Sequence, residues 1–128
     1  MKKQFTKGEW IADLRSGCCA VYPKKNEGDT NGCHQYDKRN IFYSNKGCKY
    51  DEKNGYWTMS QEEQANAQLI SAAPDLFEAL INIENDDNRI PATIWEMRNK
   101  ALNKALGEEY FKTTKKSSYG KTLFKNTA

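Results

Sequence analysis

The sequence contains no long hydrophobic run. Of its 128 residues 38% are hydrophobic, and the mean hydropathy of −0.95 is strongly polar. No apolar stretch approaches the ~20 residues that a membrane-spanning helix needs. The chain opens with a lysine pair that no apolar run follows, which is unlike a secretion signal. The sequence therefore predicts a protein of the cytoplasm.

Signatures of catalysis are also missing. The chain has a single histidine and no GxGxxG, HExxH or GxSxG pattern. Gly120-Lys121-Thr122 matches the end of a phosphate-binding loop, but Lys115 stands where such a loop needs its first glycine. Acidic pairs such as Glu62-Glu63 suit helix starts, where they complement the helix dipole. We therefore expect a protein that is not an enzyme, needs no cofactor or metal, and acts by binding.

Cysteine is present but poorly arranged for chemistry. Zinc sites use ligand pairs two to four residues apart, whereas Cys18 and Cys19 are adjacent and point to opposite faces of a strand. Four cysteines allow three sets of disulfides, against which a cytosolic location argues. We expect Cys18 or Cys19 to be a small core residue and Cys33 and Cys48 to lie on loops. Free, disulfide-bonded and metal-binding states all remain open, as does contact of His34 with Cys48 or Cys18; the simplest interpretation of His34 is an exposed loop residue.

Charge is unevenly distributed along the chain. Residues 1–25 carry a net +4, residues 26–60 are balanced, residues 61–109 carry −6, and residues 110–128 carry five lysines and no acid. A basic start and a basic end thus flank an acidic middle. Such asymmetry says more about binding partners than about the fold.

The first sixty residues have the pattern of short strands. β-branched, aromatic and small side chains alternate with turn signals, and 24–36 reads as a polar loop. Asn54-Gly55 predicts a type I′ hairpin turn, because both residues tolerate positive φ. Strands are expected at 10–14, 18–22, 40–44, around 49–50 and at 56–59.

From Ser60 onward the pattern becomes helical. Ser60 and Glu63 form a capping box, and Pro74 is expected to end one helix and start the next. Pro91 and Gly107 bound a third helix, whose apolar stripe comprises Ile94, Met97, Ala101, Leu102 and Ala105. The prediction is an α+β fold: a small antiparallel sheet packed on two to three helices near 61–73, 75–85 and 91–106. We expect one domain over 1–128, β-rich over 1–59, helical over 60–107 and ending in a basic tail, 108–128.

Aromatic and basic residues interleave between Tyr36 and Trp57. Exposed rings on a sheet can stack nucleic-acid bases while lysines neutralise phosphates. The same residues could instead pack a small sheet whose edges the lysines guard, and five acids dilute any basic field. The predicted contacts with protein or nucleic acid are Lys38, Arg39, Tyr43, Lys46, Lys49, Lys115, Lys116 and Lys121.

The segment 64–80, QANAQLISAAPDLFEAL, resembles the "ANAxLIxAAPxLLxAL" signature of small accessory proteins encoded by bacteriophages and prophages. Thr6, Gly8 and Trp10 match the family's Thr-Pro-Gly-Pro-Trp start, while both prolines are absent. The segment 94–107 is similar to the family's third helix, and 24–57 and 110–128 lie outside the resemblance. In physical terms the signature packs helices: Ala65, Ala67, Ala72 and Ala73 allow close approach, Leu69, Ile70, Leu76 and Leu80 fill the seam, and Asn66 is expected near the sheet.

The resemblance implies a phage protein in the cytoplasm of the infected bacterial host. Small accessory phage proteins are often inhibitors of host defence, including anti-CRISPR proteins. The implied function is stoichiometric binding to a defence nuclease or to its guide-RNA complex. The segments outside the resemblance are expected to contact this target, since variable loops on a fixed scaffold usually carry recognition. The alternative from the residues is a sponge or reader of nucleotides, RNA or DNA. Neither function involves a membrane.

Overall fold

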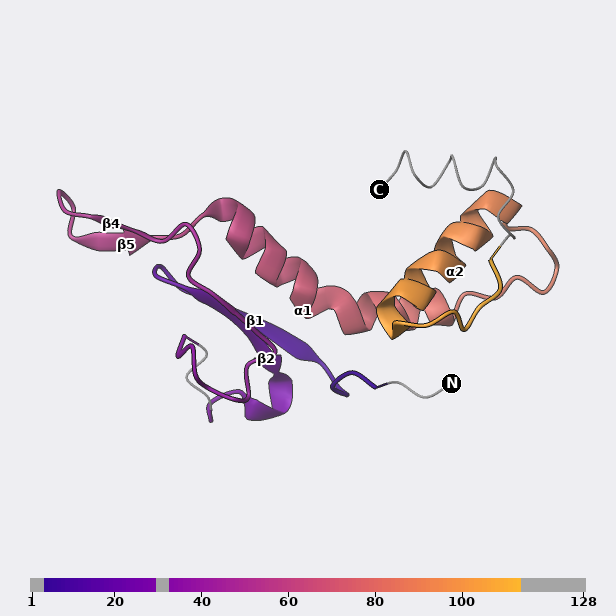
Figure 1. The fold of residues 1–128 in the computed structure, drawn as a ribbon, viewed down its shortest axis with the longest axis horizontal. Helices are drawn as coiled ribbons and strands as arrows, with labels where there is room; N and C mark the ends of the chain where they lie inside the picture. Colours follow the sequence, from indigo (N-terminus) through magenta and orange to yellow (C-terminus); the bar gives the residue numbers. More distant parts are fainter. Residues whose placement is uncertain (1–3, 30–32, 114–128) are drawn as a thin grey trace. The chain divides into compact units, whose positions relative to one another are not determined.

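The computed structural model describes residues 4–29 and 33–113 and contains two compact units, Met1–Leu76 and Phe77–Ala128, whose boundary falls within the first helix. Five strands precede two helices (Figure 1), which confirms the predicted α+β class. The single-domain organisation stays a prediction. The elements are β1 (Trp10–Leu14), β2 (Cys19–Pro23), a 3-10 turn η1 (Lys24–Asn26), β3 (Phe42–Ser44), β4 (Lys49–Asp51), β5 (Tyr56–Thr58), α1 (Gln61–Ile81) and α2 (Ala92–Leu106).

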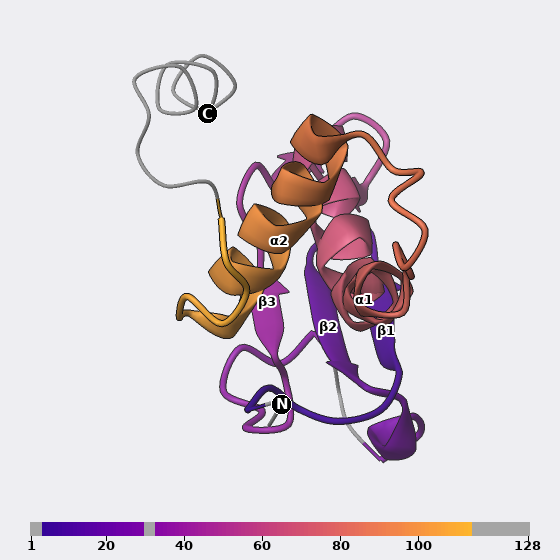
Figure 2. The same cartoon turned by 90° about the vertical axis from the view of Figure 1, so that its right-hand side faces the viewer.

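Strands β1, β2 and β3 form an antiparallel sheet in that order, with β2 in the centre. Figure 2 shows the three strands side by side. Every residue of β2 is buried, which explains why its sequence is a short continuous apolar run instead of an alternating one. The predicted positions of these three strands are confirmed to within two residues.

The core of the first unit lies between this sheet and the first turns of α1. Cys19 and Val21 of β2 contact Ala67 of α1, and all three are fully buried. Burying a valine side chain contributes roughly 1.5–3 kcal/mol. Partly buried residues extend this cluster: Trp10, Ile41, Phe42, Met59 and Ile70.

A disulfide joins Cys18 to Cys33, which corrects the expectation that disulfides are disfavoured and decides the state that the sequence left open for these two cysteines. Cys18 is the residue immediately before β2, and the loop between η1 and β3 brings Cys33 back to it. The two Cα atoms are 5.9 Å apart, a normal separation for a disulfide. The expectation rested on cellular compartment and took no account of this return of the chain. Cys19 and Cys48 are free thiols.

Strands β4 and β5 form the predicted hairpin, but they make a separate two-stranded sheet instead of joining the single predicted sheet, and the turn type differs. Four residues, Glu52–Gly55, connect the strands, and within the described chain Asn88 is the only residue other than glycine with positive φ. Asn54 therefore does not adopt the conformation that a type I′ turn needs. Gly55 alone does, with a φ of 71°.

Helix α1 runs without interruption from Gln61 to Ile81, so the predicted break at Pro74 is wrong. A proline inside a helix lacks one hydrogen-bond donor and crowds the preceding turn, at a cost of about 3 kcal/mol. Pro74 is buried on the same side of the helix as Ala67. Packing along this side therefore outweighs the local preference for a break.

The predicted capping box at the start of α1 is half confirmed. Ser60 Oγ accepts a hydrogen bond from the Glu63 amide at 3.3 Å. The Glu63 carboxylate does not reach back; it accepts hydrogen bonds from Ser44 Oγ of β3 and from Asn66 Nδ2. Asn66 is thus linked to the sheet through Glu63.

The second unit contains α2, which follows Pro91 and ends at Gly107 in the left-handed conformation, as predicted. The predicted apolar stripe is only partly buried, since Leu102 is 1% exposed whereas Ile94 and Met97 are 52% and 53% exposed. The buried residues of the helix are one apolar and one polar residue, Leu102 and Asn99.

Polar side chains of α2 hold the segment that follows the helix. Asn103 Oδ1 accepts the backbone amides of Tyr110 and Phe111, and its Nδ2 donates to the Phe111 carbonyl at 2.8 Å. Asn99 Nδ2 donates to the Lys112 carbonyl. Arg98 donates to the last carbonyls of α1, at Leu80 and Ile81, and lies over the Trp95 and Phe111 rings, 4.3 and 4.6 Å from their centroids. None of the helices in the described residues is both long enough and apolar enough to cross a membrane.

Candidate functional site

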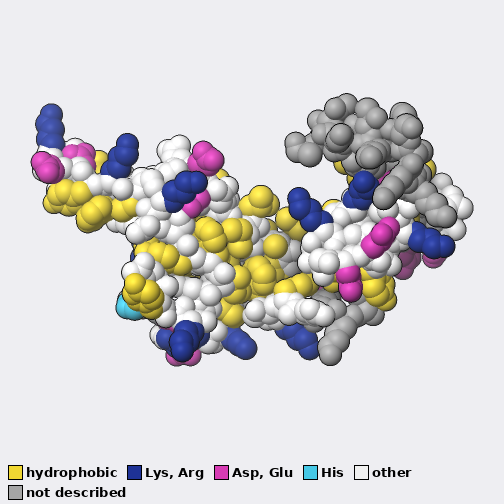
Figure 3. Space-filling model, in the orientation of Figure 1, with side chains coloured by type: hydrophobic (Ala, Val, Ile, Leu, Met, Phe, Trp, Pro, Cys, Tyr) yellow, Lys and Arg dark blue, Asp and Glu magenta, His cyan; other side chains and the backbone are white. Residues whose placement is uncertain are grey.

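The β4–β5 hairpin exposes three large aromatic side chains. Tyr50, Tyr56 and Trp57 have exposed fractions of 50%, 51% and 49%. Lys49 on β4 and Lys53 in the turn are exposed beside them. Figure 3 shows hydrophobic side chains along this hairpin with charged groups at its tip. We call this set of residues (Lys49, Tyr50, Lys53, Tyr56 and Trp57) the hairpin surface.

Tyr50 and Trp57 are directly opposite one another on the two strands and therefore share a face. Their ring centroids are 5.2 Å apart and the ring planes cross at 61°, an edge-to-face contact. Tyr56 is paired with Asp51 and lies on the other face. Both faces of the hairpin thus offer an aromatic ring to a partner.

The turn of the hairpin is held by Asp51. Its carboxylate accepts the amides of Lys53 and Asn54 and the side-chain amide of Asn54, at 3.0, 3.1 and 2.9 Å. These hydrogen bonds, that from the Asn54 side chain first, lower the pKa of Asp51. The Gly55 amide donates to the Asp51 carbonyl at 2.7 Å. The hairpin surface is therefore carried on a fixed turn.

Two glycines lie where the hairpin packs against the rest of the first unit. A Cβ at Gly17, in the β1–β2 turn, would lie 3.8 Å from Trp57 Cβ, so that turn touches Trp57. Gly47, just before β4, has a φ of +77°, and a Cβ there would lie 2.5 Å from Ser60 Cβ. The root of the hairpin therefore packs directly against the start of α1.

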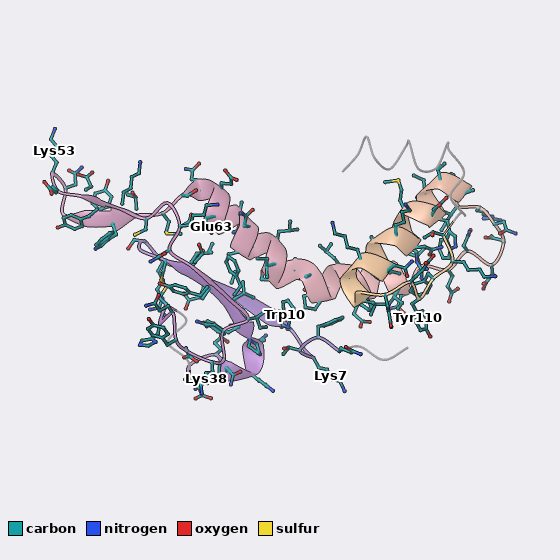
Figure 4. All side chains as sticks on the ribbon, in the orientation of Figure 1. Lys7, Trp10, Lys38, Lys53, Glu63 and Tyr110 are labelled. Atoms are coloured by element: carbon teal, nitrogen blue, oxygen red, sulfur yellow. A yellow bond between two sulfur atoms is a disulfide. The ribbon has the colours of Figure 1, made fainter. Side chains whose placement is uncertain are left out.

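Below this root lies a buried carboxylate. Glu63 is 9% exposed and accepts hydrogen bonds from Ser44 Oγ and Asn66 Nδ2, which lower its pKa. A carboxylate with a depressed pKa is a weak base, which does not suit general-base catalysis near neutral pH. The hydrogen bonds of Glu63 instead link β3 to α1. Figure 4 shows Glu63 at the start of α1, beside the root of the hairpin.

The sequence matches the family of Salmonella phage P22 protein Y8K6 over residues 1–109. The chain belongs to this family. No curated protein and no solved structure matches the chain.

Membership in the P22 Y8K6 family supports the resemblance to phage proteins and widens its extent. The match includes residues 24–57, which the resemblance leaves out. The inference that 24–57 carries recognition because it departs from the family therefore loses its basis. Residues 110–128 lie beyond the match.

Three of the predicted contact residues lie near the hairpin. Lys49 is part of the hairpin surface, and Lys46 is exposed in the turn that precedes it. Tyr43 of β3 is half-buried and, by strand alternation, points to the face opposite Ser44. Lys46 and Lys49 are thus brought together at the root of the hairpin, while Tyr43 belongs to the sheet.

Lys38 and Arg39 lie in a different place, on the loop after Cys33. Figure 4 shows Lys38 well separated from Lys53 at the hairpin tip. Arg39 makes a two-pronged ion pair with Asp37, with Nε–Oδ1 and Nη2–Oδ2 distances of 3.0 and 3.1 Å. That pair offsets much of its charge. Lys115, Lys116 and Lys121 lie outside the described residues.

The sequence-based set of contacts omits four residues of the hairpin surface: Tyr50, Lys53, Tyr56 and Trp57. The prediction placed the first sixty residues in one sheet, whereas aromatic residues on both sides of a turn in a separate two-stranded sheet have too little neighbouring structure to be covered. Cys18 is in the disulfide and so offers His34 no thiol, and His34 Nδ1 accepts the Tyr36 amide at 3.3 Å. Across 4–29 and 33–113, no three His, Cys, Asp or Glu side chains are grouped to hold a metal ion.

Proposed function

We propose that this phage protein acts by stoichiometric binding, without turnover of its own, and that its target is a host defence nuclease or the guide-RNA complex of that nuclease. In this role it is an anti-CRISPR-like inhibitor. The chain belongs to the family of a phage protein, which supports the proposal of a target in the host. The observation that carries the binding role is the half-exposed aromatic set on the hairpin surface.

Tyrosine and tryptophan are enriched among residues that dominate binding energy at protein interfaces, together with arginine. They bring a large contact area at a low entropic cost, because each has only two rotatable side-chain bonds. Here the turn is already fixed by Asp51, which lowers the ordering cost further. Lys46 and Lys49 at the root, with Lys38 and the lysines of the C-terminal segment, would steer the approach to an acidic partner.

The test is affinity capture from the native host, with and without nuclease treatment, combined with an immunity assay during co-expression. The wild-type chain should recover a defence nuclease and reduce immunity. Tyr50→Ala and Tyr56→Ala should each weaken capture by about 30-fold or more, since interface hot spots cost at least about 2 kcal/mol each. Tyr36→Ala is the matched control, because Tyr36 is a 77% exposed aromatic residue away from the hairpin. Unimpaired immunity and no captured defence protein would refute the proposal.

A second candidate is direct binding of nucleotides or nucleic acid by the same surface. The open Tyr50 and Trp57 rings beside Lys49 and Lys53 favour it, because stacking and phosphate neutralisation are the two terms of sequence-independent binding to single strands. It predicts salt-sensitive binding of purified RNA, DNA or cyclic nucleotides without any protein. Capture that nuclease treatment abolishes would favour this candidate, and flat titrations at low salt would remove it.

A further inference from the structure

Helix α1 carries two apolar stripes within the first unit. The inner stripe comprises Ala67, Ile70 and Pro74, which are buried or half-buried, and continues at the buried carboxylate of Glu63; Ala67 and Ile70 belong to the core against the sheet. The outer stripe is the same pattern shifted by two residues, which is about 200° around a helix. It consists of Ala65, Leu69, Ala72 and Leu76.

Three of the four residues of the outer stripe are exposed to solvent, and Ala72 is half-buried. Leu69 is 64% exposed and Leu76 is 49% exposed, and Ala65 is also exposed. A helix that covers one sheet needs only one apolar side, and the second leaves two leucines in water at heptad spacing. The family-like signature is therefore split in the structure. Ala67 and Ile70 serve the core, whereas Ala65, Leu69 and Leu76 do not.

Charge is depleted around the outer stripe. The thirteen residues from Gln64 to Leu76 hold one charged side chain, Asp75, in a protein with 29% charged residues. Loss of charge and gain of apolar side chains is the pattern of the centre of a protein interface. A basic or strongly acidic partner has little to recognise here.

The alternation of large and small residues along the outer stripe favours a second copy of this chain as the partner. When two copies of the stripe run antiparallel, Leu69 meets Ala72 of the second copy and Leu76 meets Ala65, so each large side chain faces a small one. The same register brings Gln68 beside Asp75 of the second copy, an amide donor beside a carboxylate acceptor. One twofold axis generates all four contacts, as a closed dimer requires. Alternation of large and small residues across facing helices is also what gives close packing.

We propose that the outer stripe of α1 is the interface between two copies of this chain, paired antiparallel about a twofold axis that passes between Leu69 and Ala72. The paired segment is about 20 Å long. One pair of helical segments of this length buries less surface than the roughly 1,200–2,000 Å² of tight complexes, so the dimer is in reversible equilibrium with the monomer. The inference is independent of the binding role of the hairpin surface.

The first test is sedimentation velocity of the full chain over a concentration series. The wild-type chain should shift from monomer to dimer, and Leu69→Gln should raise the dissociation constant by about tenfold or more, because each dimer loses two leucine contacts. Ile94→Gln is the matched control, since Ile94 is 52% exposed on α2, and it should leave the equilibrium unchanged. A wild-type chain that stays monomeric throughout, or equal effects of the two variants, would overturn the proposal.

The second test probes the register. Leu69→Ala should weaken the dimer by removing the large side chain, and Ala72→Leu should weaken it by placing two leucines face to face. The double variant, Leu69→Ala with Ala72→Leu, exchanges the large and small positions and should restore the dissociation constant to within about threefold of wild type. A double variant no better than the single ones rules out the antiparallel register. Loss of helix signal in Leu69→Gln would show that the stripe is covered within one chain, which also overturns the proposal.

Discussion

Gly47 meets two constraints at once, a backbone conformation and a close contact. Its φ is +77°, and a side chain there would lie 2.5 Å from Ser60 Cβ. Gly8 shares only the first constraint: its φ is +92°, but no atom lies within 4 Å of a Cβ built there. Substitutions at the two glycines therefore distinguish the cost of a left-handed backbone from the cost of steric overlap.

We expect Gly47→Ala to lower the free energy of unfolding by about 2–4 kcal/mol, the sum of a left-handed backbone and an overlap with the start of α1. Gly8→Ala should cost only about 1 kcal/mol, because strain acts alone. Urea unfolding of both variants checks this. Equal losses would show that Ser60 moves aside freely.

Glu63 makes stability depend on pH. Its pKa in the folded chain lies below the ordinary value of 4.5, because Ser44 and Asn66 donate to its carboxylate. A group with a depressed folded pKa stabilises the fold above its unfolded pKa, and that contribution is lost as pH falls through the folded pKa. The wild-type urea midpoint should therefore decrease on acidification from about pH 5 to about pH 3.

Glu63→Gln should have a lower urea midpoint than wild type at neutral pH, and the difference should shrink over the acidic range. Glu62→Gln, at an exposed position one residue earlier, is the control for loss of a charge at the helix start. A difference between Glu63→Gln and wild type that stays constant down to about pH 3 would contradict the assigned role of the carboxylate.

At the scale of elements, Asn103 fixes how the chain leaves α2. Its side chain makes three hydrogen bonds to the backbone of Tyr110 and Phe111. Asn103→Ala removes the side-chain partner of the Phe111 amide and carbonyl, while the Tyr110 amide keeps its hydrogen bond to the Glu108 carbonyl, and the loss should cost about 1–3 kcal/mol. Lys104→Ala, at the exposed neighbouring position, should stay within about 0.5 kcal/mol of wild type.

Hydrogen exchange at the amides of Tyr110 and Phe111 measures this effect directly. Both amides donate to Asn103 Oδ1, so their protection should fall in Asn103→Ala and stay unchanged in Lys104→Ala. Equal protection in all three proteins would mean that other contacts hold the segment.

Elements were predictable from sequence where local signals and packing agree. The strands, the Ser60 cap and the Gly107 stop were all predicted, because turn residues and caps act over a few positions. The predicted break at Pro74 is wrong, since burial along α1 overrides the local cost of proline. The apolar stripe predicted for α2 is only partly buried, because Arg98, Asn99 and Asn103 on this helix donate to backbone carbonyls. Hydrophobic periodicity does not reveal that a polar helix face makes such contacts.

Contacts between distant parts of the chain were the hardest to predict. The Cys18–Cys33 bond depends on the path of a polar loop, and the Glu63–Ser44 contact joins residues 19 apart in sequence. The candidate site was partly predicted. Lys49 lies on the hairpin surface, but its aromatic residues become recognisable as exposed only once β4 and β5 are seen to form a sheet of their own.

For the whole molecule, the disulfide makes stability depend on the redox state. It closes a loop with a sequence separation of 15, for which the chain-entropy contribution is about 3 kcal/mol. Cys33→Ser should lower the free energy of unfolding of the oxidised protein by about 2–3 kcal/mol. Reduction of the wild-type protein should have the same effect.

Cys48→Ser serves as the control, because Cys48 is a free thiol. Its unfolding should resemble that of wild type under oxidising conditions and should respond to reductant in the same way. An oxidised wild-type protein that is no more stable than Cys33→Ser would remove the disulfide from the account of stability.

The position of Arg98 over Trp95 and Phe111 gives the protein an optical probe. A guanidinium 4.3 Å from an indole centroid perturbs the emission of that indole, and Phe111 belongs to the segment that Asn103 holds. Fluorescence of Trp95, isolated by replacing Trp10 and Trp57 with phenylalanine, would therefore change in colour or intensity when that segment detaches. The chain thus reports on its own C-terminal attachment without any added dye.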